Sequence, residues 1–412
     1  MSTPAYNTEN VINTNTRAEL VLIRSAEAAP YLTVGSKNYC KDQLVGKRNG
    51  QSYEFVIRDA GEYVEGMDIS SIGSDDVIER KVTKKIKIGN VKVNTNLLEK
   101  VTDANWDTEI AEPYGEKVAK GLVQSVLADD IGRQNVAFVG TGWLPLFKAS
   151  NYLESVSSES QYAFIDPMID SIMQSSGKAY TPAGDVEPRF QKGLKGMVGQ
   201  AEVRAQQGMP TIEISADLAT ELAAAKVTSY TDNGDDTATL ALSGVTKVIP
   251  AGTPLFIKGV YATDLVGVKT SALKAFIAIE DATAGSVKIR AVDFSGNGTR
   301  EACDVNGDNI NPASDLANLD LVNSIKEGIY FTGIFRVNGA MEFDALPELD
   351  WSNAESRVTS PDGITLHEGR AVDVFAGTNK TRWAIAAVAG IVESRGCAYV
   401  CIKDNTANLV SM

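Results

Sequence analysis

Histidine is almost absent from this chain of 412 residues, since His367 is the only one. A nucleophilic triad that depends on histidine would have to use it, and no serine stands in a nucleophile-elbow pattern. Zinc ligation is equally poorly supplied, because the chain has neither a Cys-x-x-Cys pair nor a His-x-x-x-His pair. We therefore predict that His367 is structural or exposed and not catalytic, that the protein is not an enzyme, and that it has no catalytic, cofactor-binding or metal-binding residues.

Cysteine is also scarce. Four cysteines in a chain of this length do not make a disulfide framework, which indicates a reducing, cytoplasmic origin. Cys397 and Cys401 lie four residues apart in a segment typical of a β-strand. At that spacing they would be roughly 13 Å apart and could not form a disulfide bond.

Long apolar runs are missing as well. The longest, Trp383 to Val392, has ten residues, whereas a helix needs about 20 to cross a bilayer. The first twenty residues are polar and rich in Asn and Thr, without the apolar core of a secretory signal. We therefore expect a soluble protein that is not exported by that route.

Basic residues are outnumbered, 39 against 53 acidic ones, which gives a formal net charge of −14. This balance disfavours a protein whose affinity comes from neutralising phosphates. The hydrophobic share of 43% is ordinary for globular proteins and supplies the cores of two or three domains.

Two glycine-rich stretches resemble phosphate loops only loosely. They are "GTG" at 140–142 and "GLKGMVG" at 193–199, and neither is followed by Gly-Lys-Ser/Thr. Tight turns explain them better. Acidic residues are plentiful, but no spacing singles out a pair for acid–base catalysis.

The stretch "CDVNGDNINPASDL", residues 303–316, is similar to a calcium loop. The glycine expected at its sixth position is Asn309, Pro312 stands at the ninth, and nothing helical precedes it. Asp and Asn building turns is therefore the favoured interpretation, with calcium binding as the alternative. The oxygen ligands at loop positions 1, 3, 5 and 12 would be Asp304, Asn306, Asp308 and Asp315.

The N-terminal part predicts arms. Residues 1–20 are too polar to bury much surface, which is typical of a flexible arm. Apolar residues alternate in 53–57 and again in 82–93, where the phase slips at Gly89-Asn90, so two long strands with a bulge or turn at the slip are expected. The acidic stretch between them, 59–79, is long for a connection without a function. We interpret 50–93 as an extended β-arm.

The returning strand of this arm is basic. Its positive charges form either a solvated face or a contact with an acidic surface on a neighbouring copy. The residues concerned are Arg80, Lys81, Lys84, Lys85, Lys87 and Lys92.

Helical periodicity is clearest over 112–135, where apolar residues form two rows at i, i+4 spacing and Pro113 suits the first turn. The three glycines in this segment each weaken a helix by roughly 1 kcal/mol relative to alanine, so packing must hold it. A second helix is expected over 167–176 with Asp166 as its N-cap, and a third over 215–226.

From about residue 227 the period changes to two. Short strands separated by turn-forming stretches, such as "DTATLALSG" and "TPLFIKGVY", predict a small all-β barrel or sandwich inserted late in the chain. The C-terminal stretches are again mostly typical of strands.

An N-terminal arm, a long β-arm, a long helix and a late β insertion follow one another in the order of parts of tailed-bacteriophage major capsid proteins, which have the Hong Kong 97 capsid fold. The chain resembles the coat protein family of phage P-twenty-two most, because that family carries an extra inserted β-barrel. The segments with this resemblance are "TNLLEKVTDANWDTEIAEPYGEKVAKGLVQSVL", "GLKGMVGQAEVRAQQGMPTI" and "DTATLALSGVTKVIPAGTPLFIKGV".

The resemblance implies an α+β fold with an N-arm, a β-hairpin E-loop, a spine helix, and peripheral (P) and axial (A) domains. It places the N-terminal arm at 1–30 and the E-loop with the start of the P domain at 31–100. The spine helix with P and A segments would occupy 101–210, the inserted barrel 211–302, and the return to the A and P domains 303–412.

The implied function is a major capsid protein that assembles as hexamers and pentamers into an icosahedral shell around double-stranded DNA. Implied partners are other copies of the chain, a scaffolding protein, a portal protein and, as an optional addition, a decoration protein. The shell would be assembled in the host cytoplasm and become the virion, without sequence-specific binding of DNA. The alternatives are a calcium-binding cell-surface or adhesive β-protein that uses residues 304–315, and a hydrolase centred on His367.

Overall fold

The structure is a computed structural model, and it divides into two compact units. The first unit comprises 1–53, 84–127 and 342–390, and the second comprises 54–83, 128–341 and 391–412. The residues that the structure describes are 19–25, 27–37, 52–58, 79–94, 105–176, 196–283, 285–295, 299–322, 325–346, 354–359, 365–373 and 378–404. Helices and strands are both well represented, so the predicted mixed α+β class is confirmed.

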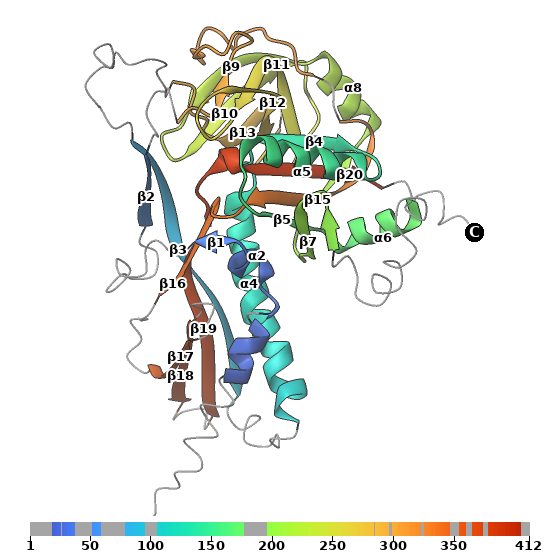
Figure 1. Ribbon diagram of the computed structural model, residues 1–412. Helices are drawn as coiled ribbons and strands as arrows, with labels where there is room; N and C mark the ends of the chain where they lie inside the picture. Colours follow the sequence, from blue (N-terminus) through green and yellow to red (C-terminus); the bar gives the residue numbers. More distant parts are fainter. Residues whose placement is uncertain are drawn as a thin grey trace, which may run out of the picture. The chain divides into compact units, whose positions relative to one another are not determined.

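The first unit is built on a seven-stranded sheet with the order β1-β16-β19-β18-β17, in which β3 pairs with β19 and β2 pairs with β3 (Figure 1). Its two long strands, β3 and β19, run antiparallel along their shared edge. The strands are β1 (Ser36–Lys37), β2 (Ser52–Arg58), β3 (Glu79–Asn94), β16 (Met341–Ala345), β17 (Ala354–Thr359), β18 (Thr365–Asp373) and β19 (Thr378–Ile391).

The predicted long helix is present as α4 (Glu112–Asp130), preceded by a short π-helical turn, η1 (Asp107–Ala111). The residues in the middle of both predicted apolar rows are buried. This confirms the prediction that the apolar face of the helix packs against the rest of the protein. The helix ends five residues before the predicted end at 135, because Gly132 has a left-handed φ of 90° and breaks the helical path. The buried members of the two rows are Val118, Ala119, Leu122, Val123, Val126 and Leu127.

The bulge predicted at Gly89-Asn90 is wrong. Pairing between β3 and β19 runs from Ile86↔Val388 to Asn94↔Lys380 without a break in register. The buried side of β3 changes at this point because α4 covers the face of Gly89. A Cβ atom on Gly89 would overlap the carbonyl oxygen of Val118 and lie 2.9 Å from the Cβ of Leu122. Glycine is therefore required at position 89, because the strand and the helix approach each other too closely for a side chain.

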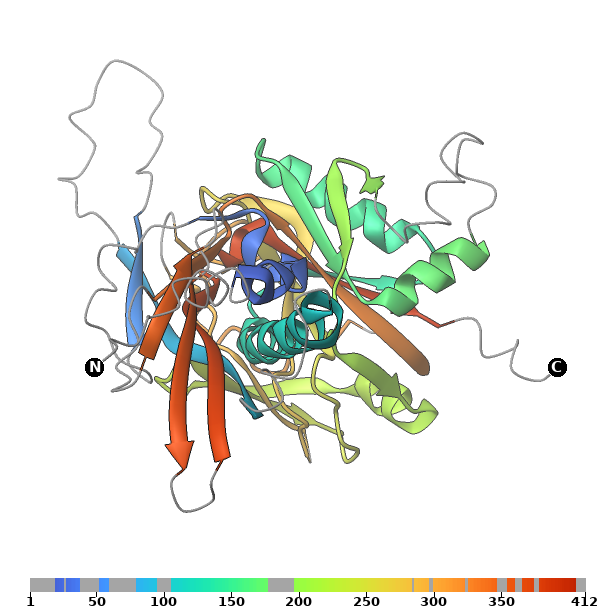
Figure 2. The same ribbon diagram turned by 90° about the horizontal axis from the view of Figure 1, so that it is seen from below.

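The start of this helical region is held by aromatic and ionic contacts. Trp106 and Tyr114 meet the buried ring of Trp383 edge to face, with ring centroids 6.5 Å and 6.1 Å apart. Arg24, in the helical segment 19–25, donates from Nε to the Asp107 carboxylate at 3.0 Å and also forms an ion pair with it. Figure 2 shows this N-terminal segment beside α4.

The second unit is built on another seven-stranded sheet, with the order β4-β20-β15-β5-β7-β6 and with β8 paired to β15. Two of its pairings are parallel, β4 with β20 and β5 with β7. The strands are β4 (Val136–Gly140), β5 (Gln161–Ile165), β6 (Gly196–Val198), β7 (Ala201–Ala205), β8 (Thr211–Ile214), β15 (Gly328–Val337) and β20 (Cys397–Lys403).

Helices accompany this sheet. α5 (Leu144–Val156) packs on β4 and β20, and α6 (Pro167–Ser176) contacts β15. The predicted N-cap of α6 is confirmed, because the Asp166 carboxylate accepts the Met168 amide at 2.8 Å. Among the residues that the structure describes, no helix is long and apolar enough to span a membrane.

The late β-rich region forms two three-stranded antiparallel sheets, β13-β10-β9 and β12-β11-β14, instead of one closed barrel. It follows α8 (Ala216–Ala224), whose N-cap Ser215 accepts the Leu218 amide. The boundary expected at residue 211 falls in β8, a strand of the main sheet, whereas the small sheets begin at Lys226. The strands are β9 (Lys226–Asp232), β10 (Thr237–Ser243), β11 (Pro254–Thr263), β12 (Lys269–Ile277), β13 (Ser286–Arg290) and β14 (Ala302–Cys303).

Two glycine substitutions should change stability in opposite directions. Gly89→Ala forces a methyl group into the α4 backbone and should lower the free energy of unfolding by about 1–3 kcal/mol. Gly121→Ala, on the exposed side of α4 with nothing within 4 Å, should raise it by about 1 kcal/mol through helix propensity. Urea denaturation of both variants measures these two changes in the free energy of unfolding. A Gly89→Ala protein as stable as the wild type would contradict the close packing of β3 and α4.

Candidate functional site

His367 lies on β18 and is fully buried. Its Nε2 atom is 3.1 Å from the carbonyl oxygen of Leu346. The next residue, Glu368, accepts a hydrogen bond from the Trp383 indole at 3.1 Å, so the contacts of this region hold a sheet and its aromatic core together. Of the two alternatives predicted for His367, structural or exposed, this position fits the structural one.

The residues similar to a calcium loop form two separate turns. Asp304 Oδ1 accepts the backbone amides of Asn306 and Asp308, both at 2.8 Å, and these amides hold the pKa of the Asp304 carboxyl below its usual value. Asp315 instead accepts the amide of Asn311 at 2.8 Å. The interpretation of these residues as turn builders is confirmed. Within the described ranges, no group of three or more His, Cys, Asp or Glu side chains could hold a metal ion.

The glycine-rich stretches also have local roles. Gly140 ends β4, and Gly142, with a φ of 64°, turns the chain toward α5. Of the second stretch, 193–195 lies outside the described residues, and Gly196–Val198 is the edge strand β6. Tight turns explain the first stretch, as expected.

The basic strand of the predicted β-arm is only partly a charged face. Lys85 and Lys92 are exposed, whereas Lys84 is buried. Lys84 alternates with Lys85 on the pleated strand and lies on the same buried side as Val82 and Ile86. The prediction that Lys84 belongs to a charged surface is therefore wrong. The side chains of Arg80 and Lys81 and the acidic stretch 59–78 lie outside the described residues.

A buried ion pair within the small sheets is hydrogen-bonded to the body of the second unit through Asn135 and Ser394. Lys274 on β12 and Glu301 have side chains that are 3% and 4% exposed, with Nζ and Oε2 3.4 Å apart. Lys274 also donates to Asn135 Oδ1 at 2.9 Å, and Glu301 accepts the hydroxyl of Ser394. Asn135 in turn donates to the carbonyl of Thr263 at 2.7 Å. We call these five residues the buried polar junction.

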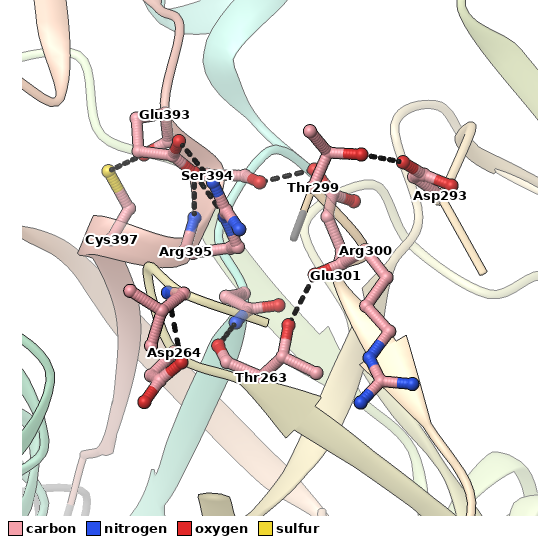
Figure 3. A network of polar contacts seen from close by, with 12 residues as sticks. Thr263, Asp264, Asp293, Thr299, Arg300, Glu301, Glu393, Ser394, Arg395 and Cys397 are labelled. Carbon is pink, nitrogen blue, oxygen red and sulfur yellow. Dashed lines mark hydrogen bonds and ion pairs between the residues drawn. The ribbon is translucent and has the colours of Figure 1, made fainter. Parts of the chain in front are cut away.

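Figure 3 shows three of the junction residues, Thr263, Glu301 and Ser394, which come from distant parts of the chain. Glu301 lies between Ser394, which precedes β20, and Thr263 at the end of β11. A charge removed from water needs several polar partners to offset its desolvation, and here each charge has them. The small sheets are therefore held to the body by directional contacts as well as by apolar packing.

A second polar contact between these parts lies at the end of α4. Arg290 on β13 lies 3.8 Å from Asp129 and 3.9 Å from Asp236, and Arg133 also pairs with Asp236. Burial, and then the neighbouring Arg133, lower the pKa of Arg290. The two contacts together restrict the small sheets at separated points.

Neither contact is predicted by the sequence. Lys274 and Glu301 are 27 residues apart, and each lies more than 90 residues from its partner Asn135 or Ser394. The one available signal was Lys274 standing directly before an apolar strand segment, "AFIAI". That pattern does not separate a buried lysine from one at a strand edge.

A pocket of about 410 Å³ opens between the first turn of α5 and the small sheet that contains β11 and β12. Its lining is apolar apart from Thr141 and Lys148. The exposed side chain of Leu144 forms part of the rim. The residues that line it are Ala137, Phe138, Val139, Gly140, Thr141, Leu144, Pro145, Lys148, Phe256, Ala272, Leu273 and Val322.

No protein-family model matches the sequence, and no curated protein matches it. Among solved structures, the chain is similar to the capsid of Ralstonia phage GP4, with 8% identity, a TM-score of 0.43, and coverage of 90% of this chain and 87% of that one. It is similar to a structure from Mycobacterium phage Che8, with 10% identity, a TM-score of 0.41 and 90% of each chain covered. A virus-like particle from Pyrococcus furiosus has 10% identity and a TM-score of 0.40, with 93% and 97% covered.

Removing one charge of the buried polar junction should be far more costly than removing an exposed one. Lys274→Ala leaves Glu301 buried without its cation and should lower the free energy of unfolding by about 3–5 kcal/mol. The control is Lys120→Ala, which breaks the surface pair with Glu116 and should cost less than about 1 kcal/mol. Urea denaturation of both variants tests this. Equal losses would show that the junction contributes no more than a surface pair.

Proposed function

We propose that this protein is a major capsid protein, the subunit that assembles as hexamers and pentamers into the icosahedral shell of a tailed bacteriophage. The observation that supports this most is the length of β3. Of its sixteen residues, only Ile86–Asn94 pair with β19, and the remaining seven continue beyond that edge in a ribbon with β2. Val82 and Lys84 on one side of this ribbon are buried, whereas Thr83 and Lys85 on the other side are exposed. Because a two-stranded ribbon is marginally stable by itself in water, the exposed side is expected to pack on a neighbouring chain.

Other properties are consistent with a shell protein. Exposed strand edges and lysines such as Lys85 and Lys92 provide contacts for copies of the chain. A net charge of −14 suits a wall that encloses double-stranded DNA without sequence-specific binding. In this proposal the chain is a structural subunit and not an enzyme, and it needs no cofactor or metal.

The remaining parts of the proposal concern organisation and partners. We assign the N-arm to 1–30, the E-loop and start of the P domain to 31–100, the spine helix with P and A segments to 101–210, and the return to 303–412. The insertion is assigned to 211–302, with its small sheets beginning at Lys226, after β8 of the main sheet. A scaffolding protein and a portal protein would direct closure in the host cytoplasm, and a decoration protein could bind the finished virion.

Electron microscopy combined with sedimentation tests the proposal directly. The purified protein, expressed alone and with scaffolding proteins from tailed phages, should form closed shells, or sheets and tubes of hexamers. The subunit should fold in either case, because each unit has its own core. A monodisperse monomer under every condition would overturn the proposal.

The exposed lysines of β3 should matter for assembly and not for folding. Lys85→Glu combined with Lys92→Glu should leave the melting temperature within about 2 °C of the wild type, because surface substitutions rarely exceed ~0.5 kcal/mol. The assembled fraction in sedimentation should fall severalfold, because a strand whose two lysines have become glutamates repels an acidic neighbour.

The control for this prediction carries the same change in net charge elsewhere. Lys258→Glu with Lys326→Glu alters two exposed lysines of the second unit and should assemble as the wild type does. If both double variants assembled normally, Lys85 and Lys92 would be a solvated face with no role in contacts between copies.

A further inference from the structure

The turn formed by residues 304–308 presents an apolar side chain to solvent. Val305 is 57% exposed, although the backbone that carries it is held firmly. Asp304 accepts two amides of the turn through its carboxylate, and its own amide donates to the carbonyl of Asp308 at 3.0 Å. Lys269 donates from its ammonium group to the carbonyl of Val305. A turn held in this way loses little entropy when it binds.

A second loop at the same end of the sheet also presents apolar side chains to solvent. Asp264 Oδ1 accepts the amides of Val266 and Val268 at 3.0 and 2.8 Å, and both valine side chains are more than half exposed. Arg300 joins the two loops, because it donates to the carbonyl of Gly267 and to the side chain of Asn309, both at 2.9 Å. We call Val266, Val268 and Val305 the valine knob.

The knob carries negative charge. The Asp308 side chain is exposed, and it forms no hydrogen bond or ion pair with the part of the chain that the structure describes. Three ordered valines beside a carboxylate are a surface whose apolar part gains free energy when it is covered.

The pocket at α5 has complementary properties. Its volume of about 410 Å³ lies within the ~300–1,000 Å³ typical of binding pockets. Lys148 is the only charged residue that lines it, and among the described residues this lysine has no ion-pair partner. The pocket therefore suits an apolar protrusion that has a carboxylate beside it.

We propose that the valine knob of one copy docks in the pocket of a second copy, with Asp308 paired to Lys148. This inference rests on the proposed function and adds a specific contact to it. A chain cannot fill its own pocket, because both features are held on the same strand pair, β11 and β12, at different positions along it. A knob that fits a pocket elsewhere on an identical chain makes a heterologous contact, which generates rings when the rotation closes.

The proposal also explains the residues similar to a calcium loop. Asp304 and the turn it builds serve to fix Val305 and Asp308 in position for the neighbouring copy. The sequence pattern of alternating Asp and Asn then reflects preorganisation of a contact surface.

Cysteine cross-linking within assembled particles tests the contact. Val305→Cys combined with Leu144→Cys, in a Cys40→Ser background, should give dimers and higher multimers up to closed rings after mild oxidation. The two single variants should give none, because the native Cys303, Cys397 and Cys401 are buried. A disulfide requires Cα atoms about 4.4–6.8 Å apart, so its formation reports docking and not mere proximity.

A charge exchange provides an independent test. Lys148→Asp or Asp308→Lys alone should raise the protein concentration needed for assembly by about tenfold, and the double variant should return to within about threefold of the wild type. Val305→Asp should impair assembly, whereas Val248→Asp, at a similarly exposed valine outside the knob, should not.

The outcomes separate this inference from the proposed function. Shells that form normally but give no cross-link and no rescue by charge exchange would overturn the knob and leave the capsid proposal intact. A Leu144→Cys cross-link to a co-expressed scaffolding protein, with no cross-link between copies of the chain, would assign the pocket to the scaffolding protein. That result would also overturn the docking of the valine knob. A wild-type chain that never assembles would overturn both.

Discussion

The second unit depends on burying Lys274 and Glu301 together. Neither charge could enter the protein alone, because the desolvation of an isolated ion exceeds what apolar contacts nearby can offset. The pair is tolerated because Asn135 and Ser394, from the body of the unit, complete its hydrogen bonds. As a result, the small sheets can adopt one position relative to the main sheet of this unit. The orientation of the knob and the shape of the pocket both follow from that position.

A steric constraint has the same importance in the first unit. α4 contacts β3 closely enough to exclude a side chain at Gly89, and this contact lets Val118 and Leu122 cover a strand that also pairs with β19. The long strand is thus anchored along its second half, while its first half continues as a ribbon with β2. For a shell subunit, a firm base beneath an arm is useful, because contacts made by the arm are then transmitted to a packed core.

The comparison of sequence with structure shows which signals were local. The face of α4, the cap at Asp166 and the turn at Asp304 were predicted, because each depends on residues within a few positions of one another. The end of α4, the bulge at Gly89 and the surface role of Lys84 were predicted wrongly. For the last two, a neighbour distant in sequence decides the outcome: Gly89 meets α4, and Lys84 is covered where its exposed neighbours are not. The end of α4 is instead set by Gly132, whose left-handed φ breaks the helix.

By itself, the sequence determined the mixed α+β class, the helices α4, α6 and α8, the β-rich late region and the scarcity of residues for catalysis. These depend on periodicity and composition, which are properties of short segments. The sequence did not predict α5 (Leu144–Val156). Only the tertiary structure decided that the late strands form two sheets, that Lys274 and Glu301 meet, and that an apolar pocket with one lysine lies beside α5. The physical reason is that burial and pairing between residues far apart in sequence depend on how whole elements pack. A charged residue looks the same in the sequence whether its side chain is exposed to water or buried in a core.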